Sequence, residues 1–211
     1  MADQEWQFGE FPDQASAVSF LNADPKQGRG EASATLRNDG TVGLLYLEPG
    51  SLGADPSPAW YVIEESSSAG AVSFLNADPK QGPGEASATL RNDSTVGLLY
   101  LEPGSLGTDP SPAWYVIEES DASDTLSFLN ADPRQGPGEA SATPRSTGTV
   151  GLLYLEPGSL GAALSPSWLV AEFPTPQDAV NFLNAPPQQT AGEAAGFIRS
   201  DNSTVVFYLE P

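Results

Sequence analysis

The clearest hydrophobic pattern in the chain is an alternating segment followed by a continuously apolar one. In residues 31–37, alanine and leucine alternate with polar side chains, which puts the apolar residues on one face of an expected strand. Residues 38–40 (Asn-Asp-Gly) are types that tolerate the positive φ angles of a tight turn. Residues 41–48 are apolar on both faces, which is typical of a central strand. The pattern predicts a β-hairpin whose second strand is central.

A strand and a helix are predicted ahead of each such hairpin. Residues 60–64 (Trp-Tyr-Val-Ile-Glu) are aromatic and β-branched, as strands prefer. Trp60 and Val62 are expected on the core face, because the third position is apolar in every copy. A good N-cap residue follows at positions 13, 67, 121 and 175 (Asp, Ser, Asp and Thr). The helix is predicted to run for about ten residues and to end before Pro25.

These elements recur with a period of 54 residues. The spacing holds without a gap for Trp6, Trp60, Trp114 and Trp168, for Phe20, Phe74, Phe128 and Phe182, and for Tyr46, Tyr100, Tyr154 and Tyr208. Residues 17–59 and 71–113 differ at only three positions, which indicates a recent duplication of the whole unit. Such a fixed period is the signature of a repeat architecture.

The sequence therefore predicts an α+β fold of four tandem β-α-β-β repeats. Each repeat is expected to form a three-stranded antiparallel sheet in the order 1-3-2, with one short helix. The expected repeats are residues 1–49, 60–103, 114–157 and 168–211, and the Pro/Gly-rich connectors are 50–59, 104–113 and 158–167. Pro144 lies in the first hairpin strand of the third copy, and a proline there indicates an edge strand.

One helix covers only one face of a sheet, so the other face is expected to be bare. Leu45 and Leu47 are expected on that face, together with Tyr61 or Ile63. A unit of this size is also close to the limit of about 40 residues for independent stability. We therefore expect the units to pack on one another as a ring, a stack or pairs, rather than to behave as separate beads.

Composition adds a charge imbalance to this picture. The chain has 28 acidic and 8 basic residues, for a formal charge of −20, and the cause is a shortage of Lys and Arg rather than runs of acids. Self-repulsion of this size favours solubility. Phosphate binding needs a basic stripe, so nucleic acid is not an expected ligand. The charge by itself suggests one function, an acidic inhibitor that mimics nucleic acid, which is the second alternative to the favoured function given below.

The residue types exclude much of catalytic chemistry. The chain has no Cys and no His, so disulfides, Cys/His zinc sites and Ser-His or Cys-His pairs are ruled out. No glycine-rich phosphate loop follows a strand, and no calcium-loop spacing is present. We expect no cofactor, no metal and no enzymatic activity.

The candidate ligand contacts repeat with the unit. Each tryptophan could stack on a ligand, and the polar loop after each helix could supply amide groups, although large aromatics more often form part of a core. Glu31 and Arg37 lie on the polar face of one predicted strand, and each is most simply explained as part of a cross-strand pair rather than as a ligand contact. The candidates are Trp6, Trp60, Trp114, Trp168, Asn22, Asn76, Asn130, Asn184, Gln27, Gln81, Gln135 and Gln189.

The favoured function is a multivalent protein-binding or assembly scaffold, because linked copies raise avidity without new contacts. Its alternative is a multivalent, lectin-like binder of small ligands or glycans, with one site per repeat. A protein partner or self-association is expected, and a glycan is the other possible ligand. The N-terminus lacks a signal-peptide pattern and no apolar run is long enough to span a membrane, so a cytoplasmic protein is the default expectation.

Overall fold

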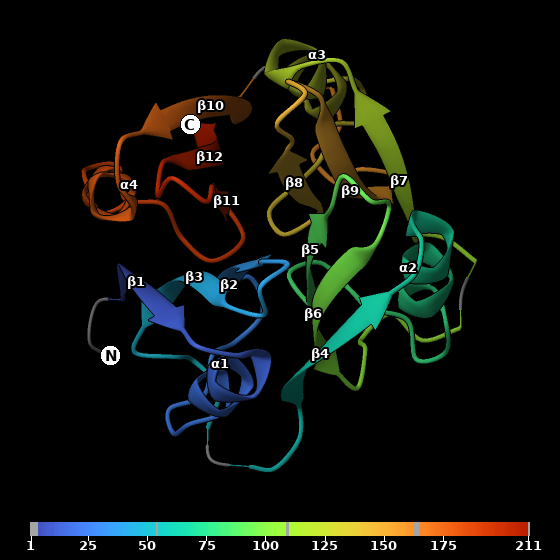
Figure 1. Cartoon of the computed structure of the whole chain (residues 1–211). Coiled ribbons are helices and arrows are strands. Elements are labelled where there is room, and N and C mark those ends of the chain that lie inside the picture. Colours follow the sequence, from blue (N-terminus) through green and yellow to red (C-terminus); the bar gives the residue numbers. More distant parts are fainter. Residues whose placement is uncertain (1–3, 54, 109, 163–164, 211) are drawn as a thin grey trace.

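The computed structural model describes residues 4–53, 55–108, 110–162 and 165–210. Each repeat supplies a first strand, a helix, and the two strands of a hairpin, and Figure 1 shows all four sets. The first strands are β1 (Glu5–Phe11), β4 (Ala59–Glu65), β7 (Ala113–Glu119) and β10 (Ser167–Phe173). The helices are α1 (Gln14–Leu21), α2 (Ser68–Leu75), α3 (Ala122–Leu129) and α4 (Pro176–Leu183). The hairpin strands are β2 (Ala32–Leu36), β3 (Val42–Glu48), β5 (Ala86–Leu90), β6 (Val96–Glu102), β8 (Ala140–Pro144), β9 (Val150–Glu156), β11 (Ala194–Ile198) and β12 (Thr204–Glu210).

The predicted fold class is confirmed. Each sheet has the order first strand, return strand, first hairpin strand, as in β1-β3-β2. All pairings are antiparallel, and the return strand is central. The physical reason is the one read from the sequence: only the return strand is apolar on both faces, so burial of both faces favours the middle place.

Side-chain caps fix where each helix begins. Asp13 has an extended backbone and accepts a hydrogen bond from Ser16 N at 2.7 Å, and the other three copies are capped in the same way. The helices span eight residues, slightly fewer than predicted. Ala17 and Leu21 form the buried stripe of α1, and Asn22 is its C-cap.

The four sheets form a closed ring. Their inner strands, β2, β5, β8 and β11, contact one another in turn, and β11 returns to β2 (Figure 1). Each helix lies toward the outside, wedged between its own sheet and the first strand of the next repeat; α4 contacts β1 in this way. The four repeats are arranged around an axis like the blades of a small propeller, and each repeat is called a blade below. The expectation that the units pack on one another is confirmed.

One end of the axis is closed by the backbone itself. Gly30 N donates to Gly84 O, Gly84 N to Gly138 O, Gly138 N to Gly192 O and Gly192 N back to Gly30 O, at 2.8–2.9 Å. These glycines have φ between +71° and +80°, which favours glycine. An added Cβ at Gly30 would lie 2.5 Å from Gly192 N, so the close approach also requires glycine.

The prediction for the two faces of the first strand is wrong. Trp60 pairs with Leu101 and Val62 with Leu99, so the tryptophan shares a face with the leucines expected to be bare. That face packs on Ala17 and Leu21 of the preceding repeat, in one cluster with them. Ile63 instead faces its own helix. Both faces are buried by protein, so hydrophobicity alone could not tell them apart.

The inner strands are edge strands whose free backbone groups are satisfied by the neighbouring repeat. Ala34 N donates to Ser87 Oγ at 3.1 Å, and Leu36 N donates to Thr89 Oγ1 at 2.9 Å. The pattern recurs between repeats 2 and 3 and between repeats 4 and 1. Pro144 lies on such an edge, because β8 pairs only with β9, so the edge-strand prediction is confirmed. Hydroxyl groups thus bond the blades without merging their sheets.

Candidate functional site

The twelve candidate residues come together at the junctions between repeats. Trp60 N donates to Asn22 Oδ1 at 2.8 Å, and Asn22 Nδ2 donates back to Trp60 O at 2.9 Å. The indole Nε1 of Trp60 donates to Gln27 O at 2.8 Å. We call this set, an Asn and a Gln of one repeat holding the Trp of the next, the seam latch. Each latch fastens a blade to its successor.

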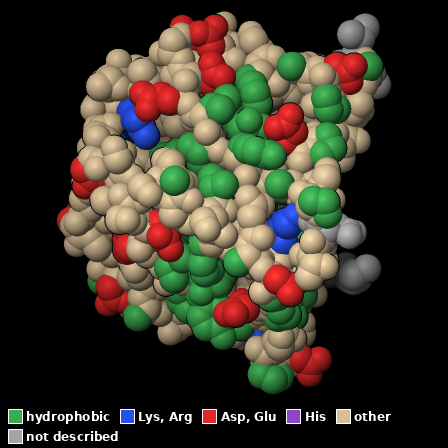
Figure 2. All heavy atoms as spheres, turned by 90° about the vertical axis from the view of Figure 1, so that its right-hand side faces the viewer, with side chains coloured by type: hydrophobic (Ala, Val, Ile, Leu, Met, Phe, Trp, Pro, Cys, Tyr) green, Lys and Arg blue, Asp and Glu red, His purple; other side chains and the backbone are tan. Residues whose placement is uncertain are grey.

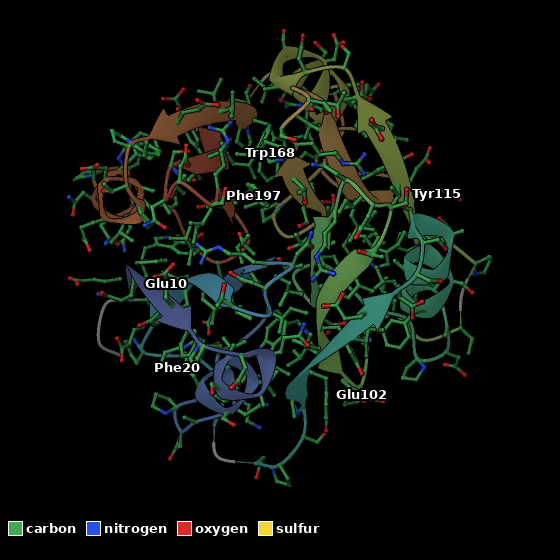
Figure 3. The ribbon with its side chains drawn as sticks, viewed as in Figure 1. Glu10, Phe20, Glu102, Tyr115, Trp168 and Phe197 are labelled. Carbon is green, nitrogen blue, oxygen red and sulfur yellow. The ribbon has the colours of Figure 1, made fainter. Side chains whose placement is uncertain are left out.

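All four seam latches are formed. Asn76 and Gln81 hold Trp114, Asn130 and Gln135 hold Trp168, and Asn184 and Gln189 hold Trp6 across the junction of repeats 4 and 1. The four indoles are 0–1% exposed. Figure 3 shows Trp168 turned inward between blades. Ligand contact at these twelve residues stays a prediction; their hydrogen bonds are made within the ring.

The repeated glutamate is also part of the scaffold. Glu31 is 2% exposed, and its Oε2 accepts hydrogen bonds from Gly28 N and from Ser51 N at 2.9 Å. Glu85 and Glu139 do the same in the next two repeats. The carboxylate therefore ties the loop after the helix to the connector. The cross-strand ion pair expected for Glu31 is not observed among the described residues; its Oε2 accepts from loop and connector backbone.

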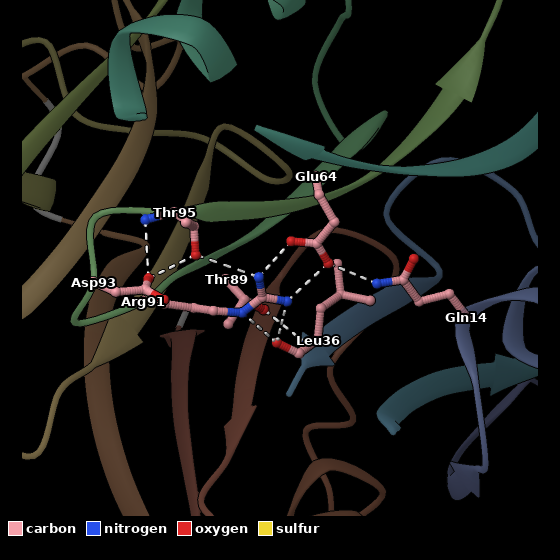
Figure 4. Close-up of polar contacts among 7 residues, drawn as sticks. All are labelled: Gln14, Leu36, Glu64, Thr89, Arg91, Asp93 and Thr95. Carbon is pink, nitrogen blue, oxygen red and sulfur yellow. Dashed lines mark hydrogen bonds and ion pairs between the residues drawn. The ribbon is translucent and has the colours of Figure 1, made fainter. Parts of the chain in front are cut away.

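Each repeated arginine does pair across its sheet, with a glutamate of its own first strand. Arg91 pairs with Glu64, and its Nη2 donates to Leu36 O of the preceding repeat at 3.1 Å (Figure 4). Gln14 of that repeat also donates to Glu64. Hydrogen bonding to Arg91 lowers the pKa of the Glu64 carboxyl. The corresponding pairs are Arg37–Glu10, Arg145–Glu118 and Arg199–Glu172.

The four arginines surround a cavity at the end of the axis opposite the glycine closure. Its walls are the last residues of the inner strands and the turns that follow them, residues 35–39, 89–92, 143–146 and 197–201. The cavity measures about 600 Å³. We call it the axial cup. It is within the size range of small-ligand sites, about 300–1,000 Å³.

A second surface feature lies on the outer rim. Tyr61 and Tyr115 are the large hydrophobic side chains that stay exposed in the described part of the chain, at 44% and 45%. Tyr61 stacks on Tyr100 with ring centroids 5.8 Å apart, and Phe74 meets the other side of Tyr100 edge-on at 4.7 Å. Repeat 3 forms the same group from Tyr115, Tyr154 and Phe128. We call each group of three rings a rim cluster.

Repeats 1 and 4 build their aromatic groups differently. Their first strands carry Gln7 and Leu169 where repeats 2 and 3 carry tyrosine, and Phe11 and Phe173 pack on the helix phenylalanines instead. The exposed tyrosine is therefore a property of the two central repeats.

Acidic side chains accompany the rim clusters. Burial raises the pKa of Tyr100, and the charge of Glu102 adds to the effect. Burial and Glu156 raise the pKa of Tyr154 in the same way. Figure 2, which faces repeats 2 and 3, shows hydrophobic patches with Asp and Glu beside them. Figure 3 shows Tyr115 at the outer edge of the ring. The rim combines aromatic faces with negative charge.

Comparisons with known proteins add nothing to these observations: no family model, no curated protein and no solved structure matches the chain. Within the described residues, no group of three or more acids is arranged to hold a metal ion. No helix of the described chain is long and apolar enough to cross a membrane.

The sequence singled out the twelve residues of the seam latches, although as ligand contacts rather than as contacts between repeats, and the axial cup and the rim clusters were not predicted from it. The signal for the cup was present, because Arg37, Arg91, Arg145 and Arg199 keep the 54-residue period. The period alone does not say that four equivalent residues converge on one axis. The signal for the rim was the change from Gln7 to Tyr61 and Tyr115 and back to Leu169.

Proposed function

We propose that this protein is a non-enzymatic, multivalent binding scaffold whose rim clusters dock a basic partner protein. The observation that carries the proposal is the repetition of one exposed surface: Tyr61 and Tyr115 are 44% and 45% exposed in the same setting of two adjacent blades. Exposed tyrosine is enriched where proteins meet, because its ring offers large contact area at low entropic cost.

Charge selects the partner. The chain carries −20, and Glu102 and Glu156 lie close enough to Tyr100 and Tyr154 to add to the rise that burial causes in the pKa of these two side chains. Lys and Arg side chains are attracted both by such carboxylates and by the face of an aromatic ring. A partner with exposed basic segments fits both features of the rim.

The closed ring explains why two copies are useful. The seam latches and the glycine closure hold the blades in fixed relative positions. A partner with two basic segments can then engage both clusters, and the second contact forms at a high effective concentration. Joining the sites is expected to tighten binding by about 10²–10⁴-fold over a single site.

The test uses the full chain and a lysine- and arginine-rich peptide, as a single copy and as tandem copies joined by Gly/Ser linkers of increasing length. We expect weak, salt-sensitive binding of the single copy and much tighter binding of the tandem peptide. Tyr61→Gln, which installs the residue that repeat 1 carries, is expected to reduce tandem binding to the single-copy level.

Matched variants separate the rim from general electrostatics. Glu102→Gln removes a charge beside a rim cluster, whereas Glu48→Gln removes the same charge in repeat 1, where Gln7 replaces the tyrosine. Only Glu102→Gln is expected to weaken binding severalfold. Equal effects of the two variants, or a tandem peptide no tighter than the single copy at every linker length, would refute the proposal.

A further inference from the structure

The axial cup gathers arginine side chains in a strongly acidic protein. Four of the eight basic residues of the chain line it, namely Arg37, Arg91, Arg145 and Arg199. Asp39 and Asp201 are the acids in the lining, and each arginine is also paired with a glutamate of its own first strand. The cup therefore offers guanidinium donors rather than net positive charge, and guanidinium groups are the donors that best match a carboxylate.

The arginines are not equally engaged. Arg91 uses Nε and Nη2 to reach Leu36 O, at 3.2 and 3.1 Å. In Arg37 the same two nitrogens are buried and have no hydrogen-bond partner among the described residues, while Nη1 pairs with Glu10 at 2.9 Å. A guanidinium with two unused donors is a costly arrangement, and an oxyanion that reached them after a side-chain rotation would be stabilised.

The cup is also asymmetric. Phe197 stands where the other repeats carry a threonine, and Pro144 stands where they carry leucine or isoleucine. Both are half-buried and both line the cavity, so one side of the cup offers apolar surface. Figure 3 shows Phe197 in the middle of the ring. A ligand held only by charge would not need this wall.

We propose that the axial cup binds one small organic anion, whose carboxylate is taken by the arginines and whose apolar body lies against Phe197 and Pro144. The combination of a mostly preformed cavity, a few convergent polar groups and an apolar wall is that of small-ligand sites in general. The single axis of the ring limits the site to one per chain. This site is separate from the rim clusters and does not depend on their function.

The test is calorimetric titration of the full chain with benzoate. Hexanoate, benzyl alcohol and inorganic phosphate are the comparison probes. We expect saturable binding of benzoate with a stoichiometry of one and a Kd of about 0.1–1 mM. Benzyl alcohol lacks the charge and phosphate lacks the apolar body, so both are expected to bind at least about tenfold more weakly.

Two variants address the two halves of the site. Phe197→Thr installs the residue found in the other three repeats, and Arg37→Gln removes the guanidinium with unused donors. Each is expected to weaken benzoate binding about tenfold, the loss of one good polar or aromatic contact. Arg29→Pro is the matched control, because it makes the same charge change at the glycine end and gives the residue of repeats 2 and 3.

A variant can lose binding because it folds poorly, so the unaltered protein is also examined by NMR. Benzoate added to the unaltered protein is expected to shift the NMR signals of the arginine Nε–H groups in the cup and of the Phe197 ring. Absence of saturable binding up to 10 mM, a stoichiometry above one, or binding unchanged by Phe197→Thr and Arg37→Gln would overturn the proposal. Equal loss in Arg29→Pro would also overturn it, because the charge effect would then be general.

Discussion

Trp6 and Asn184 stand 178 residues apart in sequence and are joined by two hydrogen bonds. Trp6 N donates to Asn184 Oδ1 at 2.7 Å, and Asn184 Nδ2 donates to Trp6 O at 2.9 Å. The other three seam latches join blades that a connector already tethers. This latch joins the first blade to the last, which no connector tethers, and it closes the ring together with the hydrogen bonds of the inner strands at that junction.

Replacing Asn184 with alanine is expected to open that junction. The backbone N–H and C=O of Trp6 would lose their partners, which costs about 1–3 kcal/mol. Asn76→Ala removes the same two bonds at a tethered junction and should lower the free energy of unfolding by a similar amount in urea titrations. Hydrogen exchange should differ, with faster exchange at Trp6 only for Asn184→Ala, because the untethered blade can separate. Identical exchange in both variants would contradict this role.

Removing the fourth repeat should cause self-association. A chain ending at residue 167 leaves Trp6, Leu45 and Leu47 without the cover that α4 and the adjoining residues of repeat 4 provide. Exposed apolar patches of this kind promote association. Size-exclusion chromatography with light scattering should show oligomers or aggregates, whereas the full chain is expected to be monomeric at equal concentration. A truncated chain that stays a stable monomer would show that ring closure is dispensable.

The junction of repeats 3 and 4 offers a test of coupled substitutions. Pro144 has no N–H, and Phe197 has no hydroxyl to accept one, so the loss of donor and acceptor coincides. Val205 replaces the glycine that receives Leu36, Leu90 or Ile198 at the other junctions. Pro144→Leu alone is therefore expected to cost about 2–4 kcal/mol, from an unpaired N–H and overpacking.

Adding Phe197→Thr and Val205→Gly should recover much of that loss, because the three changes together recreate the arrangement of the other junctions. The measurement is a set of urea unfolding curves for all combinations, analysed as a mutant cycle. A coupling energy of about 1–3 kcal/mol is expected. Additive effects would mean that the three positions do not act together.

The Arg91–Glu64 pair predicts a pH dependence. Hydrogen bonding to Arg91 holds the pKa of Glu64 below its ordinary value of 4.5, so the pair stabilises the fold above that value and loses its contribution as pH falls through the lowered pKa. Glu64 is 43% exposed, and solvent screening limits the contribution to about 0.5–1 kcal/mol.

Glu64→Gln should therefore be less stable than the native chain at pH 7, and the difference should shrink as pH falls from about 5 to 3. Thermal melts across this range measure it. Glu65→Gln makes the same charge change on the neighbouring residue, which has no ion-pair partner among the described residues. A pH-independent difference for Glu64→Gln, or one matched by Glu65→Gln, would contradict the assignment.

Local sequence patterns were sufficient to predict the structural position of a residue wherever a single physical requirement determined that position. The capping position at Asp13 follows from the need to satisfy a helix N–H, and the central place of β3 follows from its two apolar faces. Pro144 identified an edge strand because proline cannot donate to a ladder. Each of these follows from backbone hydrogen bonding or burial within a single unit.

The candidate site was harder to predict from the sequence, because the roles of its residues depend on contacts with other units. Trp60 was expected against its own core and packs instead on the preceding repeat. Both faces of the sheet are covered by protein, so hydrophobicity alone did not distinguish them. The indole N–H finds its acceptor in Gln27 O, 33 residues earlier in the chain. Gln27 belongs to the preceding unit, so the pattern of a single unit could not identify this contact.

The sequence by itself determined the repeat, the order of elements in each unit, the central strand, and the need for every unit to cover an apolar face. Only the tertiary structure decided that the cover is the preceding unit, and that the fourth covers the first. That choice depends on the angle between successive blades, which the contacts of Ser87, Thr89 and the four axial glycines fix through close backbone approach. Closure on an axis is a property of all four copies together, so it brings Arg37 and its three counterparts into one cup although each copy places its arginine by local rules alone.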